Sequence, residues 1–198
     1  MRLVLATRND HKVREVARLL DGVRIEPLPA HVTLPAEDGT TFADNALGKA
    51  RAAAAALGRP AIADDSGVEA EALDGAPGIL SARFAGAGAT DPENLARLRA
   101  EAPPGSALRY VCVLAYAAPG GTTERTFTGE CSGTLAAEPR GTGGFGYDPA
   151  FLPADAPDGR TMAELTDVEK DAISHRGRAA RALLAWLRGP DGDSWRRP

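Results

Sequence analysis

Residues Thr41 to Gly67 read TFADNALGKARAAAAALGRPAIADDSG, and this stretch decides the class of the fold. Thr41 and Asp44 have the spacing of a capping box and Gly58 supplies a stop, so a helix is predicted between them. The apolar run PAIA that follows predicts a short strand, which ends in two acids. A helix that leads directly into a buried strand is typical of an α/β protein.

The segments before this stretch have the same alternation. LVLAT (3–7) predicts a buried first strand, and DHKVREVARLL (10–20) predicts an amphipathic helix that Gly22 ends. VRIEPL (23–28) predicts a second short strand, which prolines end. Strands and helices therefore alternate through the first third of the chain.

The segments after it predict paired strands and further helices. Thr90 and Glu93 again have capping-box spacing. The apolar run 108–117 and the alternating run 123–135 predict two strands, with PGG between them as a hairpin turn. Helices are predicted after Thr166 and after Ser174. We expect a mixed sheet sandwiched by helices.

The composition is that of an ordinary globular protein. The chain has 198 residues, of which 43% are hydrophobic and 25% charged, with a formal charge of −4. That charge argues against nucleic acid as a partner, and no apolar run approaches the roughly 20 residues of a membrane helix. Cys112 and Cys131 are expected to be buried, reduced thiols. We expect a cytoplasmic protein with one domain over residues 1–190 and a frayed tail over residues 191–198.

The acids of ADDSG are candidates for catalysis. Successive side chains of a strand point to opposite faces, so Asp64 and Asp65 cannot share one role while the strand stays regular. One can face a site while the other bonds to backbone or to a lysine. A carboxylate at a strand end suits Mg²⁺ and the activation of water. An acidic turn after the strand is the alternative.

The segment TRNDHK (7–12) lies where a strand ends and a helix begins, which suits phosphate. Thr7 and Asn9 add polar side chains, and Lys12 adds a positive charge. The alternative is that Asn9 only caps the helix while Lys12 is solvated. Upstream of the next helix, Glu37 and Asp38 are acids that favour the helix dipole, and Glu37 becomes a second metal ligand only if its turn folds against ADDSG.

The segment GTGGFGYDP (141–149) packs four glycines and two aromatic residues into nine positions. Phe145 can stack on a purine ring, and Asp148 can accept a hydrogen bond from the ring or fix the loop. The alternative makes Phe145 and Tyr147 plugs over the core. Further along, Lys170, His175 and Arg176 offer donors to an acceptor-rich ligand edge, or are a helix start with surface charges. A phosphate cradle, a carboxylate, a stacking surface and a donor cluster together indicate a nucleoside triphosphate site.

Six motifs in order resemble those of the inosine triphosphate pyrophosphatase family. They are TRNDHKVREV, EDGTTFADNALGKA, IADDSGVEA, GAPGILSARFAG, GTGGFGYDPAF and AELTDVEKDAISHRGRA, between Leu3 and Leu187. The resemblance implies an elongated α/β fold with a cleft between two lobes, a homodimer, and Mg²⁺-dependent hydrolysis of ITP, dITP and XTP to the monophosphate and pyrophosphate. Small purine nucleoside triphosphates are then the partners.

The resemblance also implies roles for individual residues. Asp65 would bind Mg²⁺ and accept a proton, with Glu37 as the best second metal ligand and Asp38 as the alternative. The residues implied in substrate binding are Thr7, Arg8, Asn9, Asp10, His11, Lys12, Ser66, Phe145, Gly146, Tyr147, Asp148, Lys170, His175 and Arg176. Two positions depart from the family pattern: Arg8 stands where many members have glycine, and Ala36 where many have another acid.

Two further hypotheses concern activity and selectivity. We expect an alkaline optimum, because hydroxide-like water and an ionised triphosphate both favour the reaction. Arg176 would donate to the 6-oxo group of hypoxanthine or xanthine, so Arg176→Ala should raise KM for ITP and narrow the gap to ATP. The rival interpretations are a nucleotide sensor without turnover, a phosphohydrolase that cleaves at the γ-phosphate, and an enzyme for modified pyrimidines.

Overall fold

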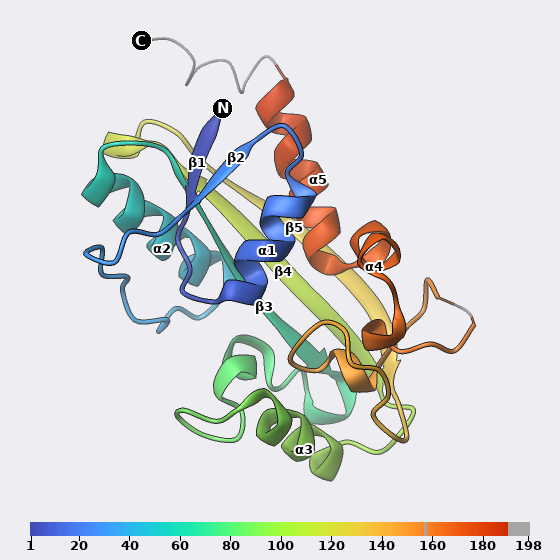
Figure 1. The fold of residues 1–198 in the computed structure, drawn as a ribbon. Helices are drawn as coiled ribbons and strands as arrows, with labels where there is room; N and C mark the ends of the chain where they lie inside the picture. Colours follow the sequence, from blue (N-terminus) through green and yellow to red (C-terminus); the bar gives the residue numbers. More distant parts are fainter. Residues whose placement is uncertain (157, 190–198) are drawn as a thin grey trace. The chain divides into compact units, whose positions relative to one another are not determined.

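A computed structural model describes residues 1–156 and 158–189 and contains a mixed six-stranded sheet (Figure 1). The strand order is β2-β1-β3-β4-β5-β6, with β1 parallel to β2 and β3, and β5 antiparallel to β6. The α/β class expected from the sequence is confirmed. The tail predicted over residues 191–198 lies outside the described residues.

The helices and strands follow the predicted order, with one short strand added near residue 151. The strands are β1 (Arg2–Leu5), β2 (Arg24–Pro27), β3 (Ala61–Ala70), β4 (Ala107–Ala117), β5 (Glu124–Leu135) and β6 (Phe151–Pro153). The α-helices are α1 (Asp10–Leu19), α2 (Phe42–Leu57), α3 (Asp91–Glu101), α4 (Asp167–Ile173) and α5 (His175–Arg188).

The chain divides into two compact units. The first comprises residues 1–65, 112–129 and 176–198, and the second comprises residues 66–111 and 130–175. Strands β3, β4 and β5 each contribute residues to both units. The prediction of a single domain over residues 1–190 remains a prediction.

In the first unit, helices cover both faces of the strands. Helix α2 lies on one side of β1, and α1 and α5 lie on the other (Figure 1). The core on the α1 and α5 side is built from Leu3 and Leu5 of β1, Ile62 of β3 and the apolar stripes of the two helices. On α5 this stripe includes Ala179, Ala180, Leu183 and Leu187, and Arg176 precedes it at the same helical spacing.

In the second unit, the core gathers around one tyrosine and one phenylalanine. The rings of Tyr110 and Phe151 have centroids 4.3 Å apart, and Leu95 and Leu98 of α3 belong to the same cluster. Both cysteines are buried and reduced, as expected. No helix in the described part of the chain is long and apolar enough to cross a membrane.

Three predicted helix starts are confirmed in detail. Thr41 and Thr90 form the predicted capping boxes, and Thr166 also forms one, with Glu169. The predicted strand end at ADDSG is wrong, since β3 continues to Ala70. Gly67 does not form a turn. A Cβ there would lie 2.4 Å from the carbonyl oxygen of Gly78 and from Ser81 Oγ, so the glycine permits close packing within a strand.

Candidate functional site

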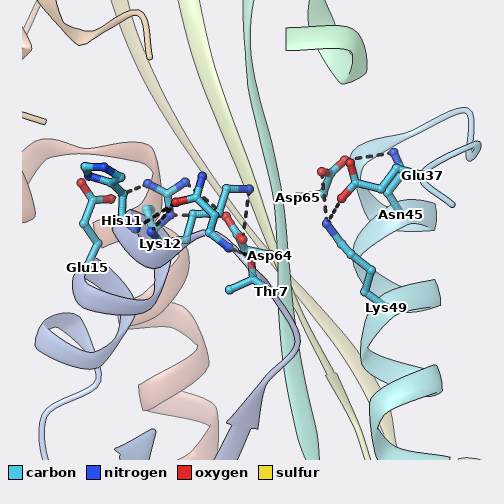
Figure 2. A network of polar contacts seen from close by, with 11 residues as sticks. Thr7, His11, Lys12, Glu15, Glu37, Asn45, Lys49, Asp64 and Asp65 are labelled. Carbon is cyan, nitrogen blue, oxygen red and sulfur yellow. Dashed lines mark hydrogen bonds and ion pairs between the residues drawn. The ribbon is translucent and has the colours of Figure 1, made fainter. Parts of the chain in front are cut away.

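Asp64 and Asp65 occupy opposite faces of β3. Asp64 follows Ile62 at the two-residue period of a strand and shares its face, which is covered by α1 and α5. Asp65 points to the other face, toward α2 (Figure 2). Because the strand stays regular through both acids, the two carboxylates have different partners, as the alternation predicts.

Asp64 is completely buried and lies between two cations. Its Oδ1 is 3.1 Å from Lys12 Nζ, and its Oδ2 is 3.1 Å from Arg176 Nη2. The Nη1 atom of the same guanidinium binds Glu15 of α1. A carboxylate removed from water in this way needs paired charges, since the desolvation cost is several kcal/mol per ion. Lys12 is thus held by an ion pair, whereas the alternative interpretation had it solvated.

Asp65 is held by two side chains of α2. Asn45 Nδ2 donates to Asp65 Oδ2 at 3.0 Å, and Lys49 Nζ donates to Asp65 Oδ1 at 3.5 Å (Figure 2). Asn45 Oδ1 in turn accepts from the backbone N–H of Gly39, so the loop before α2 is fastened to the same residue. That loop brings Glu37 to Lys49, whose ammonium therefore contacts both carboxylates.

The two aspartates have opposite pKa shifts. Burial alone would raise the pKa of Asp64, but the charges of Lys12, Arg176 and Lys49 outweigh it and hold that pKa well below its usual value. For Asp65, burial dominates and raises the pKa, although Lys49 and the hydrogen bond from Asn45 oppose the rise. A raised pKa makes Asp65 the better proton acceptor of the pair.

The contacts of Lys49 also test whether a metal ion fits. Glu37 and Asp65 direct oxygens at one ammonium, so both carboxylates face the same cation. Mg²⁺ is commonly held by one or two carboxylates together with substrate phosphates and water, so this pair fits it. Asp38, the alternative ligand, is exposed. Among residues 1–156 and 158–189, no group of three or more His, Cys, Asp or Glu residues could hold a metal ion.

The turn at residues 7–12 is organised mainly by its own side chains. Asn9 caps α1, because its Oδ1 accepts from the N–H groups of His11 and Lys12. The backbone N–H of Asn9 donates to Thr7 Oγ1 at 3.2 Å. His11 Nδ1 lies 3.1 Å from Arg14 Nη2, and Asp10 is exposed at the first helical position. The capping role of Asn9, offered as the alternative, is therefore present.

Arg8 fastens the turn to the segment of residues 28–32. Its two Nη atoms donate to the carbonyl oxygens of Leu28, Pro29, Ala30 and Val32, at 2.8, 3.0, 3.3 and 2.8 Å. These bonds engage the guanidinium with backbone. The residue that departs from the family pattern thus makes long-range hydrogen bonds to residues 28–32. A role for Arg8 in phosphate binding stays a proposal.

In the second unit, Asp148 organises the glycine-rich segment. This buried carboxylate accepts from Tyr110 Oη at 3.0 Å, from Lys170 Nζ at 2.7 Å and from the backbone N–H of Phe145 at 3.0 Å. Gly144 lies so close that a Cβ would sit 2.0 Å from Asp148 Oδ2. Asp148 therefore fixes the loop, which was one of the two roles considered for it.

The two aromatic residues of the segment have different environments. Tyr147 is buried, and its hydroxyl donates to the carbonyl oxygen of Ser81 at 2.7 Å, so it packs in the core. Phe145 is half-buried, with Lys170 Nζ 5.4 Å from its ring centroid. Between them, Gly146 N–H donates to Asp91 Oδ2 at 2.8 Å. Of the two rings, Phe145 is the one that suits a ligand.

The predicted residues thus gather in two groups. The second unit holds Phe145 to Asp148, Lys170 and His175. The imidazole of His175 stacks on the ring of Tyr110, with the two ring centroids 4.5 Å apart and an angle of 8° between the ring planes. Arg176 belongs to the first unit, where its guanidinium pairs with Asp64 and Glu15. Ser66 is half-buried and begins the second unit.

Sequence reasoning missed Asn45, Lys49, Glu15 and Tyr110. The signal for the first two was present in the helical pattern of α2. Asn45 and Lys49 are four residues apart, beside the buried positions Ala46 and Ala50, so both lie next to its packed face. A buried lysine needs an acidic partner, and the sequence alone does not indicate which acids contact Lys49 in the folded chain.

Known proteins are similar to this chain over nearly all of its length. A dITP/XTP pyrophosphatase from Geobacter sulfurreducens is 46% identical over 93% of this chain and 97% of its own, and one from Streptomyces coelicolor is 48% identical over 94% and 97%. The solved structure of a HAM1 protein from Coxiella burnetii has a TM-score of 0.83 and 40% identity, over 94% of this chain and 98% of that one. The Ham1 family profile matches residues 3–186. The order of motifs, the fold and these relatives agree, and the chain belongs to the Ham1 family.

Proposed function

We propose that this protein hydrolyses non-standard purine nucleoside triphosphates (ITP, dITP and XTP) to the monophosphate and pyrophosphate, with Mg²⁺ as cofactor. The chain is a nucleoside triphosphate pyrophosphatase, in keeping with the names of relatives 46% and 48% identical to it. The observation that carries the proposal is the environment of Asp65. This buried carboxylate has a raised pKa and shares Lys49 with a second carboxylate, Glu37.

The chemical step is assigned to residues of the first unit. Asp65 accepts a proton from the water that attacks the α-phosphorus, and Asn45 and Lys49 keep its carboxylate in place. Glu37 and Asp65 would hold Mg²⁺, which supplies Lewis acidity and neutralises phosphate charge when bound. Lys12 neutralises phosphate charge to the same extent in the bound triphosphate and in the leaving pyrophosphate, so it contributes to binding. Thr7 to Lys12 bind the triphosphate in this proposal.

Base recognition is assigned to residues of the second unit. Phe145 stacks on the purine, and Lys170 and His175 supply donors at its edge. Asp148 acts indirectly, because it holds both the Phe145 amide and the Lys170 ammonium. A site built on hydrogen bonds to the 6-oxo group rejects adenine, whose amino group is a donor at that position. The same proposal includes a cytoplasmic location and a homodimer. Sedimentation of the purified chain tests whether it is a dimer.

The role of Arg176 in reading the 6-oxo group needs a gentler substitution than alanine. Arg176→Ala would leave Glu15 and Asp64 buried without their guanidinium, at a cost of about 3–5 kcal/mol of stability. Arg176→Lys keeps the charge and removes the planar fork of donors. If Arg176 reads the base, this variant narrows the preference for ITP over ATP; unchanged discrimination in a folded variant removes Arg176 from that role.

The deciding experiment incubates the protein with ITP, XTP, dITP, GTP and ATP in the presence of Mg²⁺ and measures both phosphate products. Pyrophosphate from the first three substrates supports the proposal. Orthophosphate would indicate γ-cleavage, and binding without any product would indicate a sensor. The rate should rise with pH from the acid side, because Asp65 must be ionised to accept a proton. A rate that falls steadily from about pH 6 to pH 10 in folded protein contradicts this mechanism.

A further inference from the structure

Asp64 stands at the centre of a row of four alternating charges. The row runs Glu15, Arg176, Asp64, Lys12, and each neighbouring pair is in contact. The side chains are 10%, 2%, 0% and 15% exposed in that order. Lys12 is the most exposed member, so it is the cation through which this row meets solvent.

The row is electrically balanced only with Asp64 in place. Two carboxylates face two cations, and Asp64 is in contact with both Lys12 and Arg176. Without its charge, the two cations would lie near each other on one face of β3, with Glu15 bound to Arg176. Like charges at short range in a buried setting repel strongly. We therefore expect Lys12 to leave its position when Asp64 loses its charge.

The position of Lys12 matters because a free lysine is costly to immobilise. Its side chain carries about 2 kcal/mol of rotamer entropy, which a phosphate must overcome if it binds a mobile ammonium. Asp64 Oδ1 lies 3.1 Å from this ammonium, which carries three donors on a side chain that is 15% exposed. Lys12 is thus held before any phosphate arrives.

We propose that Asp64 is a positioning residue for triphosphate binding: it never touches the substrate and acts by holding Lys12 against β3, with Arg176 as the counter-charge. This rests on the proposed function insofar as Lys12 binds phosphate there. Asp65, its neighbour, serves the chemical step, so the two aspartates should affect different kinetic constants. A contact made equally before and during the reaction changes KM, whereas a proton acceptor changes kcat.

A double-mutant cycle tests the proposal. The four proteins are wild type, Lys12→Ala, Asp64→Asn and the double variant, and the measurements are binding of inorganic tripolyphosphate and the KM and kcat for ITP. Each single variant should bind tripolyphosphate roughly tenfold more weakly, the scale of a lost charge-assisted hydrogen bond, and KM should rise more than kcat falls. The double variant should bind no more weakly than Lys12→Ala. Additive losses overturn the proposal, because Asp64 would then act independently of Lys12.

Two further variants keep the test decisive. Glu26→Gln removes a carboxylate from β2 in the same unit, where it pairs with Arg59 at 2.6 Å, and should leave binding and kinetics unchanged. If Asp64→Asn fails to fold, Asp64→Glu replaces it in the cycle, because it keeps the charge but moves the carboxylate by one methylene. The same non-additivity with Lys12→Ala is then expected, and additivity again overturns the proposal.

A readout without nucleotide separates this proposal from the proposed function. Acylation of Lys12 by an amine reagent, followed by mass spectrometry, should become several-fold faster in the Asp64 variant. Unchanged acylation overturns the positioning role even in an active enzyme. If wild type hydrolyses none of the triphosphates, the proposed function fails, while faster acylation still supports the hold of Asp64 on Lys12. If Lys12→Ala binds tripolyphosphate as tightly as wild type does, the positioning role of Asp64 is overturned. The proposal that the protein hydrolyses nucleoside triphosphates is not affected by that result.

Discussion

Asp64 and Asp65 are consecutive residues whose carboxylates bind different helices: Asp64 pairs with Lys12 of α1, and Asp65 with Asn45 and Lys49 of α2. One strand thereby carries two acids whose pKa values shift in opposite directions. Surrounding cations lower the pKa of Asp64, and burial raises the pKa of Asp65. This division gives each acid a separate test.

The first prediction concerns Asp65 as proton acceptor. Asp65→Asn keeps the size of the side chain and removes its basicity, so kcat should fall by about 10²–10⁴-fold, the usual contribution of a general base. KM for ITP should change far less. Pyrophosphate release under saturating substrate measures the effect, and a loss confined to KM would contradict the assignment.

The second prediction separates Glu37 from Asp38 as metal ligand. Glu37→Gln should raise the Mg²⁺ concentration for half-maximal activity at least tenfold, roughly the scale on which even outer partners of metal ligands act. Asp38→Asn is the matched control, because Asp38 is exposed in the same loop, and it should leave that concentration unchanged. The reverse pattern would make Asp38 the ligand.

The third prediction distinguishes the two aromatic residues of the glycine-rich segment. Phe145→Ala should raise KM for ITP about 5–150-fold, equivalent to roughly 1–3 kcal/mol of stacking, and leave tripolyphosphate binding unchanged. Phe145→Tyr should retain most of the affinity. Tyr147→Phe removes the hydroxyl bonded to Ser81 and should lower the unfolding free energy by roughly 1 kcal/mol without changing KM. Equal KM values for wild type and Phe145→Ala would exclude stacking.

The fourth prediction concerns Arg8. Its guanidinium satisfies four carbonyl oxygens, a geometry that a lysine ammonium cannot reproduce. Arg8→Lys and Arg8→Gly should therefore both accelerate hydrogen exchange in residues 28–32. If Arg8 instead binds phosphate through its charge, Arg8→Lys will preserve KM while Arg8→Gly raises it, and exchange will stay as in wild type.

The fifth prediction is a dependence of stability on pH. Because the folded-state pKa of Asp64 lies below its unfolded value of about 3.9, the unfolded chain binds more protons in acid. The stabilisation is complete above that value and is lost as the pH falls through the folded pKa. The gap in denaturation midpoint between wild type and Asp64→Asn should thus be largest at neutral pH and shrink below about pH 4. A gap that widens in acid has the wrong sign.

Local features of the fold were predictable from the sequence, and long-range partners were not. The capping boxes at Thr41, Thr90 and Thr166 depend on residues three apart, so they form as the spacing indicates. The opposite facing of Asp64 and Asp65 follows from the period of a strand. The prediction that the strand ends there was wrong, because a glycine is typical of a turn. Gly67 is instead required by the close packing of the strand against Gly78 and Ser81.

The ion pairs of the candidate site join positions far apart in the chain. Arg176 and Asp64 are 112 residues apart, and nothing near either residue indicates the other. Lys49 was not predicted as a site residue, because helical spacing indicates which face of α2 it occupies but not which residues it contacts. The departure at Arg8 was visible in the sequence, but the carbonyl oxygens that bind it come from a segment about 20 residues away.

The ammonium of Lys49, shared by Glu37 and Asp65, means that the polypeptide carries its own counter-ion. Two acids that would repel each other are already partly neutralised by a covalently attached cation. Under the proposed Mg²⁺ dependence, removal of the ion by a chelator should therefore abolish activity without unfolding the protein. In that proposal an incoming Mg²⁺ would compete with the Lys49 ammonium, so activity would require a threshold Mg²⁺ concentration below which the protein is folded but inactive.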